Sequence, residues 1–97
     1  MGPSYGIASF ADGTWIERNV VSHGFNHGIK VGIGATGSFN HLEQNQAQAN
    51  TSAGRCGISF DNGNGHVFRN NNLRGNAASG ACGGTIGTNT DGGGNIL

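Results

Sequence analysis

Two glutamates and one arginine occupy the same position of a six-residue pattern that recurs along the chain. The pattern has an apolar residue first, asparagine fourth and an apolar residue last, and its second position holds Glu17, Glu43 and Arg69. If successive copies lie side by side as strands, the two carboxylates are about 4.8 Å apart, close to the ~5–5.5 Å of retaining glycosidases. The alternative is an exposed column in which Arg69 offsets the repulsion between the acids, contributing roughly 0–1 kcal/mol. We favour this alternative and assign no catalytic residue, keeping Glu17 and Glu43 as candidates.

Histidines and an acidic turn are the remaining candidates for metal chemistry. His23 and His27 have a spacing that suits metal ligands on a helix, but the intervening Gly-Phe-Asn favours a loop. The segment 61–65, Asp-Asn-Gly-Asn-Gly, resembles a calcium loop but lacks the later bidentate glutamate. We therefore expect a turn, no metal site and no cofactor, with calcium as the alternative.

Cys56 and Cys82 are the only cysteines, and they occupy equivalent positions of two loops that align without a gap. In adjacent repeats such positions would fall within the ~4.4–6.8 Å Cα separation that a disulfide accepts, and the bond would stabilise the fold by roughly 3 kcal/mol. A pair of buried thiols is the alternative. We favour the disulfide, which implies an extracellular or periplasmic location.

A fixed period positions all of these side chains. The asparagines of the pattern are Asn19, Asn45 and Asn71, which follow one another at equal intervals, as in a protein of stacked repeats. Their amides are expected to hydrogen-bond from repeat to repeat as a ladder. The apolar positions predict two internal columns: Ile16, Leu42 and Phe68, and Val21, Ala47 and Leu73.

Each repeat is predicted to run strand, Gly-rich corner, strand, Asn corner, loop. The first strand begins at Gly6-Ile7, Gly28-Ile29, Gly57-Ile58 and, loosely, Thr85-Ile86. Alternation turns Ile29, Val31, Ile58 and Phe60 inward, and Lys30 and Ser59 outward. The loops are 22–27, 48–56 and 74–82. Helical repeats are excluded because glycine and asparagine form helices poorly and no apolar spacing of three to four residues persists.

Composition bounds the partners. The chain has 97 residues, net charge zero and 10% charged residues, so no electrostatic case exists for nucleic acid or an anionic membrane. No segment approaches the ~20 apolar residues of a membrane span. Residues 1–5, Met-Gly-Pro-Ser-Tyr, have neither the basic region nor the apolar segment of a signal peptide, so the signal of a secreted form is expected to have been removed or to lie outside this sequence.

The unit GI…DG/NG…I/F-x-x-N-x-x-apolar resembles the right-handed parallel β-helix superfamily, the pectate-lyase-like fold. The resemblance implies an all-β, right-handed parallel β-helix of three full coils and part of a fourth, with a repeat of about 26 residues. Residues 1–97 would form one domain, either a segment of a longer solenoid or a subunit that stacks end to end into a filament. Ile96 is expected at the position of Phe68, inside the second strand.

The family also suggests a function. In pectinase-like enzymes the outward face of one sheet binds sugar, and Lys30 is the best-placed candidate here for binding or catalysis. No complete catalytic motif of such enzymes is present. We therefore expect a non-catalytic, extracellular structural or carbohydrate-contacting segment with Trp15 and Tyr5 as sugar-stacking rings. The alternative is a fragment of a polysaccharide lyase, hydrolase or epimerase acting on acidic glycans.

Overall fold

The computed structural model describes residues 6–22, 27–32, 38–48, 54–83 and 89–97. The described residues form short strands and no helix, which confirms an all-β protein, and none of them forms a helix that could cross a membrane. The strands are β1 (Ile7–Ser9), β2 (Trp15–Glu17), β3 (Val20–Ser22), β4 (Ile29–Val31), β5 (His41–Glu43), β6 (Gln46–Gln48), β7 (Cys56–Phe60), β8 (Val67–Arg69), β9 (Ser79–Cys82) and β10 (Thr90–Asp91).

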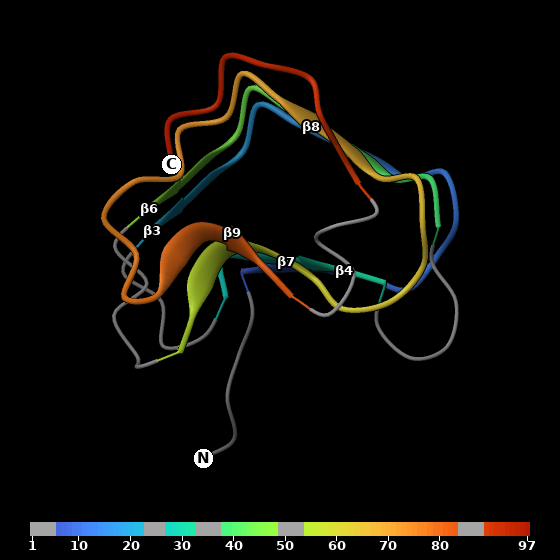
Figure 1. The fold of residues 1–97 in the computed structure, drawn as a ribbon, viewed down its shortest axis with the longest axis horizontal. Helices are drawn as coiled ribbons and strands as arrows, with labels where there is room; N and C mark the ends of the chain where they lie inside the picture. The colour runs from blue at the N-terminus through green and yellow to red at the C-terminus, as the bar shows by residue number, and fades with distance from the viewer. Residues whose placement is uncertain (1–5, 23–26, 33–37, 49–53, 84–88) are drawn as a thin grey trace.

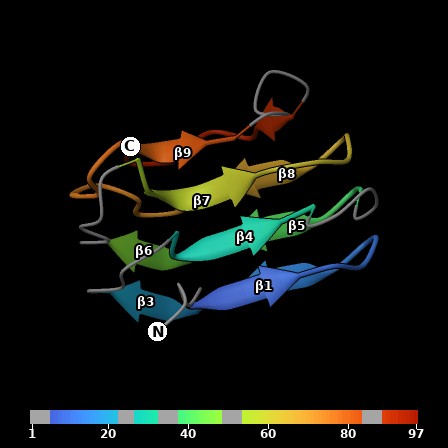
Figure 2. The ribbon, with the colours of Figure 1, turned by 90° about the horizontal axis from the view of Figure 1, so that it is seen from below.

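The strands pair in parallel in three sheets. Sheet A has the order β1-β4-β7-β9, sheet B the order β10-β8-β5-β2, and sheet C pairs β3 with β6. Figure 1 shows the three sheets as three sides around a common interior, and Figure 2 shows β1, β4, β7 and β9 as successive layers. Successive repeats of the chain therefore add neighbouring strands to the same sheets.

Sheet register follows the sequence period closely on one side and loosely on another. In sheet B, Ile16 lies opposite Leu42 and Leu42 opposite Phe68, which is the constant interval of the asparagines. In sheet A, Ile7 pairs with Ile29 and Ile29 with Ile58, as the Gly-Ile landmarks predict. The first of these two intervals is shorter than that of sheet B and the second is longer, so the connections between strands absorb the difference in length.

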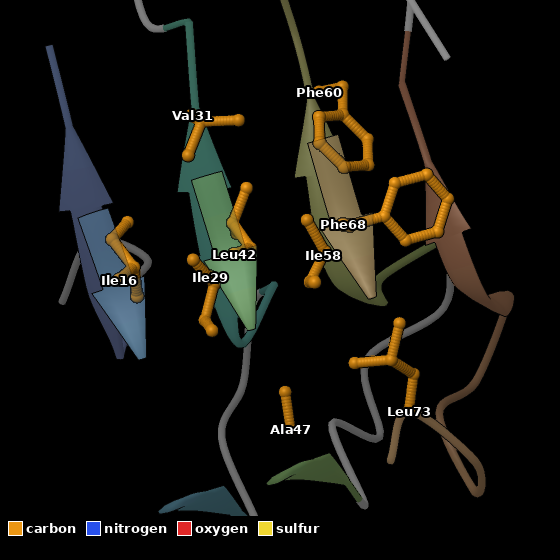
Figure 3. Close-up of a cluster of buried hydrophobic side chains, with 9 residues drawn as sticks. All are labelled: Ile16, Ile29, Val31, Leu42, Ala47, Ile58, Phe60, Phe68 and Leu73. Atoms are coloured by element: carbon orange, nitrogen blue, oxygen red, sulfur yellow. The ribbon is translucent and has the colours of Figure 1, made fainter. Parts of the chain in front are cut away.

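The core lies between sheets A and B and extends to sheet C. Its side chains come from all three sheets and pack as columns of apolar residues (Figure 3). The two predicted columns are present. The buried residues are Ile16, Ile29, Val31, Leu42, Ala47, Ile58, Phe60, Phe68 and Leu73, with Ile7, Val21 and Ala81 packed against them.

The asparagine ladder forms at the corner between sheets B and C. The backbone N–H and the Nδ2 of Asn19 both donate to Oδ1 of Asn45, each at 3.1 Å. Asn45 donates in the same way to Asn71, at 2.9 and 3.1 Å, and Asn71 to Asn95, at 3.0 Å for both bonds. Asn95 is a fourth rung that the equal-interval pattern did not include. The second amide proton of Asn45 bonds the carbonyl of Ile16 at 2.8 Å, so the buried amide is fully used.

A second ladder, which the sequence reasoning missed, lies at the corner between sheets A and B. The N–H of Thr14 donates to Asn40 Oδ1 at 2.8 Å, and the N–H of Asn40 donates to His66 Nδ1 at 3.2 Å. The N–H of His66 in turn donates to Asn89 Oδ1 at 3.1 Å. Asn40 and His66 are fully buried. This histidine is therefore part of a structural column.

The residue before each rung of the asparagine ladder is left-handed. Arg18, Gln44 and Asn70 have φ of 56°, 57° and 53°, and Gly94 has 71°. A non-glycine residue in this region costs of order 1–3 kcal/mol. The four corners thus have the same backbone turn, although only one of the four left-handed residues is a glycine.

The third side of the repeat is more ordered than predicted. A loop was expected to begin at residue 22 and to include 48–56 and 74–82, but β7 already begins at Cys56 and Ser79–Cys82 forms β9. Val20–Ser22 and Gln46–Gln48 pair there as sheet C. Ser59, predicted to point outward from the sheet, is 1% exposed, because its hydroxyl bonds Asp61 and its neighbours in register are Lys30 and Cys82.

The predicted alignment of the fourth repeat is wrong. Phe68 pairs with Asp91, while Ile96 bridges to Asn72, one corner further along. The last repeat is shorter than the ones before it. The ten-residue spacing from Ile86 therefore placed Ile96 opposite the wrong residue. Thr85-Ile86, expected to begin the fourth repeat, lies outside the described residues.

Replacing Asn45 by alanine should destabilise the protein by about 3 kcal/mol or more, because two donors of Asn19 and the carbonyl of Ile16 lose their buried partner. Asn72→Ala is the matched control, since Asn72 is half-buried and its side chain accepts one bond, from Gln48. Urea unfolding of both variants measures the difference. Equal losses would contradict the ladder as a source of stability.

Candidate functional site

An aromatic and charged surface covers the outward side of sheet B. We call the surface made by Trp15, Glu17, His41, Glu43 and Arg69 the Trp15 face. Register places Trp15 opposite His41, and Glu17, Glu43 and Arg69 in one row across three strands. The alternation within β2 buries Ile16 and turns its two neighbours outward. The predicted Glu–Glu–Arg column is therefore present.

Trp15 supplies the aromatic part of this surface. Its side chain is 64% exposed, although tryptophan is normally well buried. The indole stacks on the imidazole of His41, with centroids 4.0 Å apart and planes 24° apart. This contact covers one face of the ring, so the indole is oriented while remaining open to a ligand.

Glu43 is the polar centre of the Trp15 face. Its Oε1 lies 3.1 Å from His41 Nε2 and accepts a hydrogen bond from Arg69 Nε. The hydrogen bonds from His41 and then Arg69 lower the pKa of the Glu43 carboxyl. A general acid of a glycosidase needs a raised pKa. The arrangement fixes an ionised carboxylate and its two partners, and it does not prepare Glu43 to donate a proton.

Lys30 is placed differently from the Trp15 face. It lies on sheet A, half-buried, and its Nζ is 2.9 Å from Asp61 Oδ2. Asp61 also accepts from the Ser59 hydroxyl at 2.8 Å. The acidic turn that resembles a calcium loop thus directs its carboxylate to Lys30 and Ser59. Tyr5, the other predicted sugar-stacking ring, lies outside the described residues.

A second cluster lies on sheet A, where β7 begins. Cys56 and Cys82 form the predicted disulfide, with Cα atoms 6.2 Å apart, and the bond indicates an oxidising environment. The two residues are not directly opposite: Cys82 pairs with Ser59, while Ser79 occupies the place opposite Cys56. The loop alignment that predicted the bond therefore differs from the strand register.

His27 completes this cluster and was missed as a partner of the cysteines. The N–H of Cys56 donates to His27 Nδ1 at 3.1 Å, and Cys56 Sγ is 3.2 Å from the same nitrogen. Burial, then the charges of Arg55 and Lys30, lower the pKa of His27. His27 and Cys56 occupy equivalent places in the sequence. His27 lies two positions before Ile29, and Cys56 lies two positions before Ile58, with which Ile29 pairs. The shared x-Gly-Ile triplet was a signal that could have revealed this contact.

Comparison with known proteins adds no relative: no family model, no curated protein and no solved structure matches this chain. The chemistry of the two clusters is therefore the basis for a functional proposal.

The stability of the protein should decrease on acidification as Glu43 is protonated. Because its folded pKa is lowered, its contribution is present above the pKa of an unfolded glutamate, about 4.3, and is lost as the pH falls through the folded value. Urea unfolding between about pH 5 and pH 3 should show this decline, and Glu43→Gln should flatten it.

Glu17→Gln is the matched control, because Glu17 lies on the same row but outside the contact that joins His41, Glu43 and Arg69, and it should keep the wild-type decline. A Glu43 resonance that titrates above the ordinary range in NMR would contradict the pair of hydrogen bonds.

Proposed function

We propose that this chain is a non-catalytic segment of an extracellular right-handed parallel β-helix that contacts carbohydrate through the Trp15 face. Three parallel sheets, to which successive repeats add strands in turn, support the β-helix as the specific architecture. The disulfide supports a location outside the reducing cytoplasm.

The exposed, oriented indole is the observation that carries the proposal. Trp15 offers a flat apolar surface to a ligand while its other side packs on His41. An exposed aromatic ring with one face free suits ligands with both apolar and polar faces, and a pyranose ring has C–H groups on one face and hydroxyls at its rim. Glu43 and Arg69 lie on the same face, on the next strand and the strand after it, as acceptor and donor for such hydroxyls.

The charge of the Trp15 face also bears on the class of sugar. Arg69 is 47% exposed and can present its remaining N–H groups to a carboxylate, a geometry that favours uronic acids. The enzyme alternative receives less support, because the pKa of Glu43 is lowered and Lys30 pairs with Asp61 on another sheet.

Titration with oligosaccharides tests this proposal. Trp15 is the only tryptophan of the chain, so the intrinsic fluorescence reports directly on the Trp15 face. We expect oligogalacturonate, alginate or a neutral glucan oligomer to change the emission. Calorimetry should show that Trp15→Ala weakens binding about 10-fold, the loss of one stacked ring.

Val20→Ala is the matched control for this measurement. Val20 is 73% exposed on sheet C, away from the Trp15 face, and its truncation should leave the affinity unchanged. Absence of binding across the panel, or an equal effect of the two truncations, would contradict the proposal.

End-to-end stacking of copies is a second proposal, favoured by the direction of the asparagine ladder. Each rung donates from its N–H and Nδ2 to Oδ1 of the next rung. Within the described residues, the Oδ1 of Asn19 receives no such bond, and the ladder ends at Asn95. A second copy placed on the β9 and β10 end would present Asn19 Oδ1 to the N–H of Asn95, in a head-to-tail contact that does not close. β1, β2 and β3 together form the opposite end.

Light scattering should therefore show a mass that increases with the concentration of the 97-residue chain. Lysines at Ala8 and Val20, both exposed on the edge strands β1 and β3, should reduce this growth because charged edges resist strand pairing. A monomer near 9.8 kDa at all concentrations would contradict stacking.

A further inference from the structure

His27, Cys56 and Cys82 bring together the ligand types of a thiophilic metal. The His27 nitrogen and the two sulfurs all lie within 4.8 Å of one another. His27 is 7% exposed, Cys56 is fully buried, and Cys82 is half-buried. Nδ1 of His27 accepts the N–H of Cys56 and faces its Sγ. Because an imidazole nitrogen has a single lone pair, binding of an ion through Nδ1 would replace the hydrogen bond from the Cys56 N–H.

The geometry is close to that of a zinc site. Tetrahedral Zn²⁺ with Zn–S of about 2.3 Å and Zn–N of about 2.0–2.1 Å separates its ligand atoms by about 3.5–3.8 Å. His27 Nδ1 and Cys56 Sγ are 3.2 Å apart. No two of the three ligand atoms are more than 4.8 Å apart. Once reduction has separated the two sulfurs, each ligand atom would need to move by about 1 Å to surround an ion.

We propose that the reduced form of this protein binds one Zn²⁺ through His27, Cys56 and Cys82. A dithiol reductant supplies two electrons and two protons to the disulfide, giving two thiols, while the reductant forms its own disulfide. Zn²⁺ then replaces the two thiol protons, which pass to solvent, and the imidazole contributes its Nδ1 lone pair. The fourth position is open to water on the half-buried side of Cys82.

The surrounding charges are compatible with this assignment. Arg55 Nη1 lies 3.4 Å from His27 Nε2, so a guanidinium is at the edge of the cluster. Two thiolates cancel the charge of Zn²⁺, and the neutral centre is not repelled by the cation.

Cys56 and Cys82 would then have alternative states in different compartments. In an oxidising environment they form the disulfide, and in a reducing one they are available as metal ligands. This site lies on sheet A, whereas Trp15 lies on sheet B, and zinc binding does not depend on carbohydrate binding.

Calorimetric titration with ZnCl₂ tests the proposal on the full chain, oxidised and after reduction with a phosphine, which does not itself ligate zinc as a thiol would. The reduced protein should bind one equivalent, and the oxidised protein should bind none at the same concentrations. Cobalt(II) in place of zinc should give the thiolate charge-transfer absorption. Absence of binding by the reduced protein, or equal binding by the oxidised protein, would overturn the proposal.

Variants separate a folded site from ligation by an unfolded chain. His27→Ala should weaken zinc binding by at least about 100-fold, more than changes of outer-sphere partners do, and Cys56→Ser or Cys82→Ser should abolish it. His41→Ala, on sheet B, is the matched histidine control and should keep the affinity. Equal losses for His27→Ala and His41→Ala, or a far-UV spectrum of the reduced zinc-loaded chain without β-structure, would overturn the site.

Discussion

Satisfying buried amides at the corners is the constraint on which this structure depends. Each repeat turns inward at two corners, and the polar groups there lie out of contact with bulk water, where an unpaired group costs about 1–3 kcal/mol. The structure meets this cost by bonding each corner to the next repeat: Asn45 and Asn71 are 1% exposed and use their amides in this way. A change in register would break these bonds together, so the ladders hold the sheets in alignment.

The parts of the fold that could be predicted are those with a constant interval. Sheet B and the asparagine ladder keep one interval through three repeats, and their columns could be read from the sequence. In sheet A the interval changes from one pair of strands to the next, and the last strand, Ser79–Cys82, lacks an apolar alternation. Gly80 lies there because a Cβ would approach the Cα of Leu97 to 2.9 Å. Close packing of backbone, which leaves no pattern of side chains, explains why this strand was expected to be a loop.

The candidate sites divide in the same way. Trp15 and His41 are separated by the constant interval that also relates Glu17 to Glu43, and their stacking follows from it. His27 and Cys56 are further apart in the sequence than this interval, so a search at a single period does not bring them together. Alignment of the shared x-Gly-Ile triplets, which matches the register of β4 against β7, does so. Because the interval in sheet A differs from that in sheet B, a search at a single period does not reveal the cluster of His27, Cys56 and Cys82.

The left-handed corners have a consequence for how such a surface can change. Arg18, Gln44 and Asn70 share one backbone geometry, and Arg18 and Gln44 contact each other on the exposed edge at 3.3 Å. Their side chains leave the molecule at the strand spacing of about 4.8 Å, without reaching the core. Substitutions at these corner residues would therefore change a row of functional groups at fixed intervals, while the core residues stay the same. Polymers with a comparable repeat distance could be matched by exchanging only these side chains.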